Sequence, residues 1–217
     1  MLMKALAPLF FTIPLLLSFD AEAHPVSFKG GTAVMSFATP DWQDLEVFHS
    51  FAPDQAAGAR VLRLDGDKDG RPINRRVFGA QYNKLLKRWW WEDAQANVYL
   101  GGGVGIADGR RVSGDPVAIG LFQADYETQR VYTAVKLDLF ESADFTHLSG
   151  TVDLGAAPYA ANYEELAPWL IIRFSEMTGM DEEPDITPMF RLIYKQLFFE
   201  SGVSLDGEPR LTVMVHF

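Results

Sequence analysis

The chain closes with Arg210-Leu-Thr-Val-Met-Val-His-Phe217, the stretch that decides the fold. Every second residue in it is a large apolar side chain: Leu211, Val213, Val215 and Phe217. Successive side chains of a β-strand point to opposite faces, so this alternation predicts a strand with one apolar and one polar face. Soluble sandwiches and membrane barrels both contain such strands. The rest of the chain must therefore distinguish between these two folds.

The same two-residue period recurs in segments separated by clusters of Gly, Pro, Asp and Asn. Several of these segments reach about ten residues, the length of a tilted membrane-crossing strand and longer than an average soluble strand. Polar connections follow the third, fifth, seventh and ninth segments, and tighter or aromatic-rich ones follow the fourth, sixth and tenth. Even strand numbers and sorted connections of this kind are typical of membrane barrels. We predict twelve strands, at residues 31–38, 44–51, 59–65, 76–87, 96–107, 117–127, 130–140, 147–157, 166–174, 187–195, 197–205 and 210–217.

The predicted strands have one apolar face and one charged face. In segment 130–140, Val135 and Leu137 lie on one face while Lys136 and Asp138 lie on the other. In a membrane barrel the apolar face contacts lipid and the charged face lines the lumen. Aromatic residues also gather near strand ends, as the two membrane interfaces favour. They are Trp89, Trp90, Trp91, Tyr159, Tyr163, Trp169 and Phe217 near one end, and Trp42, Phe140 and Phe145 near the other.

On these patterns the chain resembles bacterial outer-membrane β-barrel proteins from His24 to Phe217, with 210–217 as the specific motif. We therefore expect an all-β fold, a closed antiparallel transmembrane β-barrel of about twelve strands. The sheet must close because backbone groups in hydrocarbon have to pair internally. The resemblance also implies two partners: outer-membrane lipid, and the barrel-insertion machinery that reads the terminal Phe217.

The first 23 residues have the pattern of a cleaved secretory signal peptide. Lys4 precedes an apolar run at 5–17, and Ala21-Glu22-Ala23 is a small-x-small cleavage site. Cleavage there predicts a mature barrel domain at 24–217, whose residues 24–30 form a periplasmic segment able to tuck into the lumen mouth. The expected location is the outer membrane of a Gram-negative bacterium.

Composition excludes several classes of function. The chain has no cysteine, which rules out disulfides, zinc–thiolate sites and cysteine nucleophiles. Its net charge is −10 with a pI of about 4.8, and it has no basic stripe. Nucleic acid is therefore not an expected partner.

The inward face predicted for the barrel carries charges of both signs. These should pair across the lumen, since unpaired buried charges are costly. A mixed network favours a narrow or blocked pore without a steep ion preference. We expect passive transport of small solutes, or a structural envelope role if the lumen is sealed, with the solute and oligomeric state left open. The residues predicted to line the pore and set its conductance are Arg130, Lys136, Asp138, Arg173 and Arg191. The wider inward set adds Arg63, Asp65, Gln81, Asn83, Lys87, Gln123, Asp125, Glu127, Asp153, Lys195, Glu200 and Arg210.

Two metal sites are weaker alternatives, and no cofactor is otherwise expected. Asp65, Asp67 and Asp69 match the opening of a calcium loop, but the closing bidentate Glu is missing, so a solvated acidic turn is the preferred interpretation. A mature amino-terminal His24 provides an amine and an imidazole that can chelate copper in an envelope protein. Pro25 removes the next amide as a ligand.

An enzyme is a further alternative, less favoured than a non-enzymatic barrel. Some twelve-stranded outer-membrane barrels are lipid-modifying hydrolases with Ser and His on the lipid-facing wall. His147 and Ser149 share a strand face here, but that face is the predicted lumen. Gly101-Gly102-Gly103 lies inside a strand and lacks the ending of a phosphate loop, so we interpret these glycines as structural.

Overall fold

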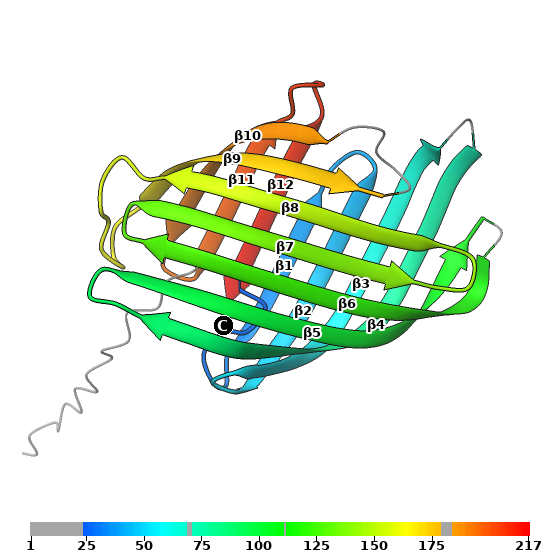
Figure 1. Cartoon of the computed structure of the whole chain (residues 1–217), viewed down its shortest axis with the longest axis horizontal. Helices are drawn as coiled ribbons and strands as arrows, with labels where there is room; N and C mark the ends of the chain where they lie inside the picture. The colour runs from blue at the N-terminus through cyan, green and yellow to red at the C-terminus, as the bar shows by residue number, and fades with distance from the viewer. Residues whose placement is uncertain (1–23, 69–70, 111, 179–183) are drawn as a thin grey trace, which may run out of the picture.

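The computed structural model describes residues 24–68, 71–110, 112–178 and 184–217, and in them the chain forms a closed antiparallel barrel (Figure 1). Each strand pairs with its neighbours in sequence, and β1 pairs with β12 to close the sheet. Among these residues, none forms a helix with the length and apolarity needed to span a bilayer. The strands are β1 (Thr32–Ala38), β2 (Trp42–Ala52), β3 (Gln55–Lys68), β4 (Arg71–Trp90), β5 (Ala94–Gly109), β6 (Val112–Thr128), β7 (Val131–Glu141), β8 (Thr146–Ala156), β9 (Ala167–Met177), β10 (Asp185–Tyr194), β11 (Leu197–Val203) and β12 (Pro209–His216).

The twelve-stranded closed barrel predicted from the period-two pattern is confirmed. The predicted polar loops at 66–74 and 108–116 are wrong, because β3 to β6 continue through most of them. The β3–β4 ladder runs on to Asp65↔Asn74 and beyond, although the side chains there are polar. Backbone pairing in a hairpin does not require apolar side chains, so side-chain patterning underestimates the length of these strands. The predicted signal peptide, residues 1–23, lies outside the described residues.

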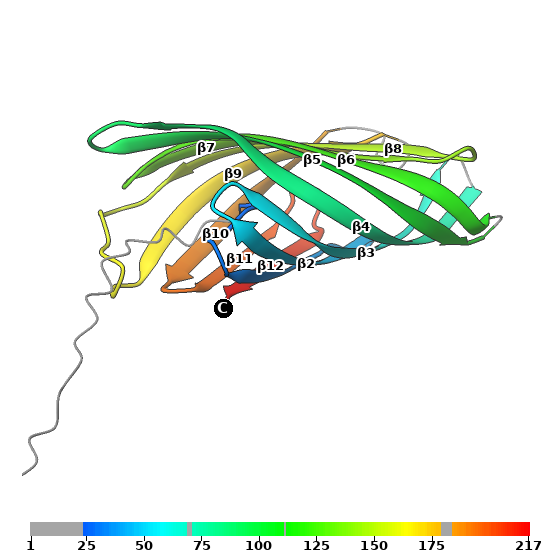
Figure 2. The same ribbon diagram turned by 90° about the horizontal axis from the view of Figure 1, so that it is seen from below.

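Strand length varies strongly around the barrel. β4 has 20 residues, whereas β1 and β11 have 7 each. At the usual rise per residue β4 extends roughly 65 Å, more than a tilted membrane strand of about 9–11 residues requires. Figure 2 shows that the wall containing the long strands β4, β5 and β6 reaches past the short strands β11 and β12 of the other wall. We call the end with Phe217 and the β4–β5 connection the terminal end, and the end with the β1–β2 and β11–β12 turns the distal end.

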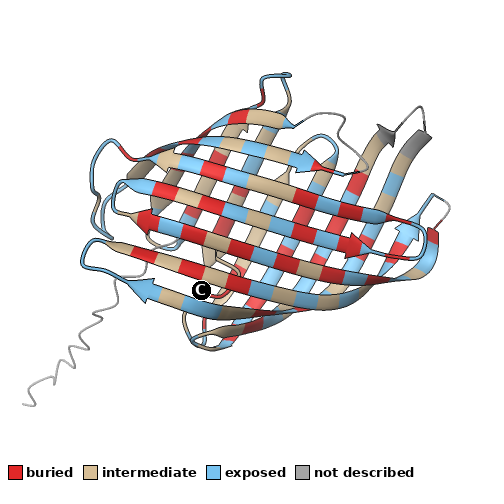
Figure 3. Ribbon diagram, viewed as in Figure 1, coloured by how far each residue is buried: buried red, intermediate tan, exposed pale blue. Residues whose placement is uncertain are grey.

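The outer surface of the barrel is apolar, and burial alternates along each strand (Figure 3). Leu100 and Leu170 are 50% and 68% exposed, while their inward neighbours Tyr99 and Ile171 are almost fully buried. A contiguous apolar surface of this kind is unusual for a protein in water and is what a lipid-facing wall requires. Val135, Leu137 and Leu154 are exposed on it as well, which excludes a sandwich with these residues in its core.

Much of the interior is filled by side chains. A distal core gathers apolar residues from β3 to β9, including Leu62, Leu64 and Phe140. A terminal core lies nearer the opposite end: Tyr132, Ala134, Ala157, Trp169, Ile171 and Met189. Small barrels are commonly packed in this way, so little of the lumen remains open.

The glycines of β5 allow its close approach to β4. A Cβ added to Gly103 would lie 2.3 Å from the backbone oxygen of Ala80, whereas one added to the outward Gly102 would meet nothing within 4 Å. Backbone cannot move aside as a flexible side chain can.

We therefore expect Gly103→Ala to destabilise the barrel by about 1–3 kcal/mol, the usual cost of overpacking, and Gly102→Ala to have little effect. Urea unfolding of both variants in lipid vesicles measures the difference. Equal midpoints for the two variants would show that β4 and β5 are not packed this tightly.

Candidate functional site in the barrel interior

A cluster of buried charges, which we call the cross-lumen cluster, links opposite walls of the barrel. It consists of Arg60 on β3, Asp44 and Glu46 on β2, and Lys136 and Asp138 on β7. Arg60 is 2% exposed and donates through Nε and Nη2 to the Asp44 carboxylate, at 3.0 and 2.5 Å from Oδ2. Its Nη1 donates to Asp138 Oδ1 across the lumen at 2.6 Å. Lys136 Nζ lies 3.3 Å from Asp138 Oδ2 and 3.7 Å from Glu46 Oε1.

A second group, the neighbour-strand cluster, follows directly from strand register. Asp153 on β8 lies opposite Arg173 on β9, and Arg191 on β10 lies opposite Glu200 on β11. Arg173 donates to Asp153 at 2.8 and 2.6 Å and to Glu200 at 3.1 Å, and Arg191 Nε donates to Glu200 at 2.9 Å. The Arg191 guanidinium carbon also lies 4.4 Å from the ring centroid of Tyr132. These guanidinium groups are thus held by carboxylates and an aromatic face.

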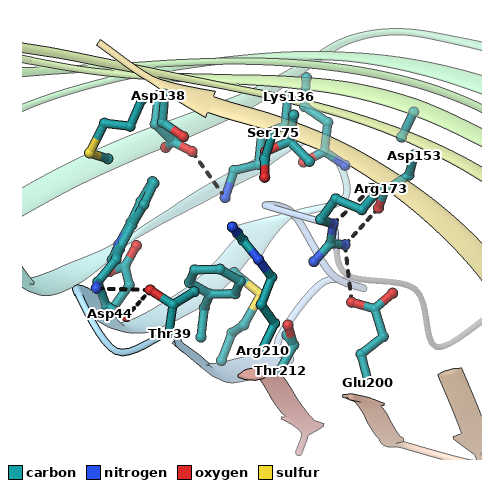
Figure 4. A pocket seen from close by; sticks show the side chains of 18 of the residues that line it. Thr39, Asp44, Lys136, Asp138, Asp153, Arg173, Ser175, Glu200, Arg210 and Thr212 are labelled. Atoms are coloured by element: carbon teal, nitrogen blue, oxygen red, sulfur yellow. Dashed lines mark hydrogen bonds and ion pairs between the residues drawn. The ribbon is translucent and has the colours of Figure 1, made fainter. Parts of the chain in front are cut away.

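Between the two clusters lies a cavity of about 170 Å³, the distal cavity. Its lining includes Thr39, Asp41 and Trp42 of the β1–β2 region and Glu208 of the β11–β12 region, so it opens toward the distal end. Figure 4 shows Lys136, Arg173 and Arg210 reaching this space from three different strands. Arg210 in turn pairs with Asp185. The barrel wall thus brings cationic and anionic side chains from distant parts of the chain into one enclosed space.

A second cavity, of about 440 Å³, lies at the terminal end beneath the β8–β9 connection. Trp90, Trp91, Tyr163 and Trp169 are among the residues that line it. Trp169 belongs to the same terminal core as Tyr132, which lines the distal cavity. The terminal core therefore lies between the two cavities.

The segment 24–30 lies inside the terminal mouth. Val26 is 4% exposed and packs with Tyr99 and other interior residues, and the His24 ring stacks on Tyr99 with centroids 5.4 Å apart. His24 Nε2 lies 3.4 Å from Asp125 Oδ2, and Asn83 Nδ2 donates to the carbonyl of Pro25 at 3.2 Å. The segment thus occupies part of the lumen at this end.

Two rim contacts outside the membrane-crossing strands shift pKa values. A hydrogen bond from Lys84 lowers the pKa of Asp54 in the β2–β3 turn. A hydrogen bond to Glu164 raises the pKa of Lys195 in the β10–β11 turn, with Nζ and Oε2 2.6 Å apart. Both contacts favour the charged form of these side chains.

Of the five residues predicted to line the pore, the structure brings Lys136, Asp138, Arg173 and Arg191 to the distal cavity. Arg130 does not line it. The sequence suggested a turn at 128–129, but β7 begins at Val131, so Arg130 lies exposed in the turn. Its Nε donates to the backbone oxygen of Ala157 at 3.2 Å.

Four other residues assigned to the lumen are also misplaced. Arg63 and Asp65 pair with each other at 2.5 Å on the outward side of β3, because Leu62 and Leu64 turn inward to the distal core. Lys87 is exposed, since a β-bulge between Leu85 and Lys87 reverses the alternation of β4.

The bulge places Arg88 inward instead, where it donates to Asn97 at 2.5 Å and to Tyr99 at 3.3 Å. Lys195, which was also assigned to the lumen, lies in the β10–β11 turn.

Sequence reasoning missed Arg60, Asp44 and Glu46. The signal for the two acids was present, because Asp44 and Glu46 alternate with the outward Leu45 and Val47. Arg60 was missed because Arg63 and Asp65 were taken to mark the inward face of segment 59–65, and Arg60 lies on the opposite face. Nothing local distinguishes the two faces of that segment.

In the described part of the chain, the alternative metal sites are represented by the side chains of His24 and Asp65, and the copper site at a mature amino-terminal His24 stays a prediction. In that part of the chain there is no group of three or more His, Cys, Asp or Glu side chains that could hold a metal ion. Asp65 contacts Arg63 and accepts from Asn74. The side chain of Asp67 is not described, and Asp69 lies outside the described residues.

The residues of the enzyme alternative face the interior. His147 and Ser149 are 2% and 5% exposed on β8. His147 Nε2 lies 2.5 Å from Arg75 Nη1, and its Nδ1 lies 3.3 Å from the Thr178 carbonyl. This side chain therefore lies in the packed distal part of the barrel, away from the lipid-facing wall.

Closed pairing, an apolar exterior and a charged interior define the architecture of outer-membrane β-barrels. Among solved structures, KdgM porin and KdgM porin in complex with disordered oligogalacturonate are similar to this chain. Each has a TM-score of 0.49 and 13% sequence identity, covering 86% of this chain and 98% of the porin. No family model and no curated protein matches the chain.

The cross-lumen cluster generates a stability prediction. Replacing Arg60 by Met leaves Asp44, Glu46 and Asp138 buried with Lys136 as their remaining cation within the cluster. Breaking a buried ion network in this way costs about 3–5 kcal/mol. We expect Arg60→Met to lower the free energy of unfolding by that amount, measured by urea titration in lipid vesicles.

The matched control is Arg63→Met, on the outward side of the same strand with its side chain 48% exposed. It should change stability by less than about 1 kcal/mol, as expected for an exposed ion pair. If the two variants were equally stable, the Arg60 contacts would contribute nothing to the closed barrel.

Proposed function

We propose that this protein is an outer-membrane barrel that offers a narrow passive path to small solutes. The observation that carries the proposal is a cavity lined by charged side chains inside a closed wall whose outer face is apolar. An apolar exterior supports a position in lipid, and an interior cavity lined by charged side chains supports passage of polar molecules.

The location proposed is the outer membrane of a Gram-negative bacterium. Residues 1–23 act as a cleaved export signal, and Phe217 forms part of the signal read by the insertion machinery. The exposed Trp90, Trp91 and Tyr159 at the terminal end support an interfacial aromatic belt there. Lipid then surrounds the apolar wall.

The path is narrow because the two cavities are separated by the terminal core, and the segment 24–30 occupies part of the terminal mouth. Solutes pass when Tyr132 and Trp169 move aside, so conductance is low and intermittent. Lys136, Asp138, Arg173 and Arg191 line the distal part of this path and set its conductance.

A sealed barrel with a structural envelope role is the second candidate. The packed distal and terminal cores favour it. It differs from the first candidate in one measurable respect, because a sealed barrel remains silent even after the side chains between the cavities are trimmed.

Planar bilayer recordings distinguish these candidates. Trp169→Ala removes an inward ring from the terminal core, so we expect small, infrequent current steps in the wild type and larger or more frequent ones in the variant. Leu170→Ala is the control, since Leu170 is the outward neighbour and should leave the current unchanged. Bilayers that stay silent for both wild type and Trp169→Ala at high protein load would refute the channel and favour the structural role.

Membrane insertion is tested separately. A closed barrel keeps its fold in detergent and migrates differently on a gel before and after heating, because every strand is paired. We expect this heat-modifiability in the outer-membrane fraction, and we expect removal of Phe217 to reduce the amount recovered there. Recovery in the soluble periplasmic fraction instead would contradict the proposed location.

A further inference from the structure

We propose that the distal cavity binds a small organic cation, with an ammonium group on a compact apolar body. This deepens the proposed function by naming the class of solute that the lumen accepts. It rests on that function only for the entry of solutes into the barrel. Binding itself requires the cavity and no conduction.

The first argument is charge. The cross-lumen cluster contains three carboxylates and two cationic side chains, so it carries one excess negative charge. The neighbour-strand cluster is balanced, as is the pair of Arg210 and Asp185. Asp41 and Glu208 at the distal opening add further negative charge. The electrostatic field inside the cavity therefore favours cations, and the low-dielectric walls of the barrel strengthen this field.

The second argument is that a buried oxygen in the cavity lining accepts no hydrogen bond among the described residues. Glu46 is 6% exposed, and its Oε1 has no hydrogen-bond partner among the described residues. Its contacts there are ionic and longer, 3.3 Å to Arg60 Nε and 3.7 Å to Lys136 Nζ. Arg60 directs its hydrogen bonds to Asp44 and Asp138 instead. A buried acceptor without a bond is costly, and a ligand ammonium would satisfy it.

Thr212 provides an independent observation on another strand. It is 5% exposed, lines the same cavity from β12, and its Oγ1 has no hydrogen-bond partner among the described residues (Figure 4). An ammonium group has three donors and no acceptor, which matches a carboxylate and a hydroxyl oxygen. Glu46 and Thr212 lie on β2 and β12, the two strands that flank β1, so one wall of the cavity presents both oxygen acceptors to it.

The third argument is the apolar part of the lining. Phe37 and Trp42 form an edge-to-face pair with centroids 5.5 Å apart, and both line the cavity together with Met35. Aromatic faces attract cations and shelter an apolar body. At about 170 Å³ the space is smaller than a drug-sized pocket, which is usually at least about 300 Å³. The occupant is therefore a small molecule.

Anions fit this cavity less well. The guanidinium groups of Arg173 and Arg191 are already bonded to Asp153 and Glu200, and that of Arg210 is paired with Asp185. An anionic solute would have to break these pairs while facing the surrounding carboxylates.

Calorimetric titration of the detergent-folded protein with benzylammonium tests the proposal. We expect saturable binding of benzylammonium, much weaker binding of benzyl alcohol, and none of benzoate. Glu46→Gln should weaken benzylammonium binding at least tenfold, because it removes both the excess charge and a charged acceptor. The variant should still fold, since it leaves two carboxylates facing two cations in the cross-lumen cluster, and heat-modifiability verifies this.

The matched control is Glu92→Gln, the same change of charge at the terminal end, which should bind as the wild type does. Thr212→Val provides a second variant and should weaken binding several-fold. Benzoate binding as tightly as benzylammonium, unchanged binding in both cavity variants, or displacement by an equal concentration of potassium would each overturn the proposal. Because calorimetry detects binding without current, a silent bilayer would refute the channel and leave this result standing.

Discussion

The structure depends on the closure of its sheet between the first and last strands. Thr32 N donates to the Phe217 carbonyl at 3.1 Å, and Phe217 N donates to the Thr32 carbonyl at 2.9 Å. With β1 paired along β12 the sheet has no free edge, so every strand has a neighbour on both sides. In hydrocarbon an unpaired backbone group costs several kcal/mol, and only closure permits a wall whose outer side chains are apolar. Phe217 therefore helps to close the sheet, in addition to its proposed role in the insertion signal.

Closure creates an interior that must itself be stabilised. This barrel does so in two ways, with apolar cores near both ends and with ion networks between them. Arg60 is central to the second, since it joins β2 and β3 to β7 across the lumen. An ion network of this kind fixes the distance between opposite walls, because its hydrogen bonds require specific geometry.

The same packing limits what the interior can do. The terminal core and the segment 24–30 divide the lumen of this barrel. Of the two cavities that remain, the distal one is small, has more carboxylates than cations in its lining, and contains two buried oxygen acceptors that lack hydrogen bonds among the described residues. The proposed selectivity for cations rests on that local chemistry and not on pore width.

The sequence by itself determined the strands, their number and most of their faces. Alternation along a strand is a local property, so the strands predicted at 210–217 and 130–140 match β12 and β7 to within one residue at each end without knowledge of their neighbours. The tertiary structure alone decided which charges share the interior. Arg60 and Arg63 lie three residues apart, and the local sequence gives no reason to place one of them inside instead of the other. Leu62 and Leu64 pack inward in the distal core, and Arg60 lies on the same face of β3 as they do. The β-bulge in β4 likewise places Arg88 inside the barrel and leaves Lys87 outside. Such choices depend on partners from distant strands, so no local pattern contains them.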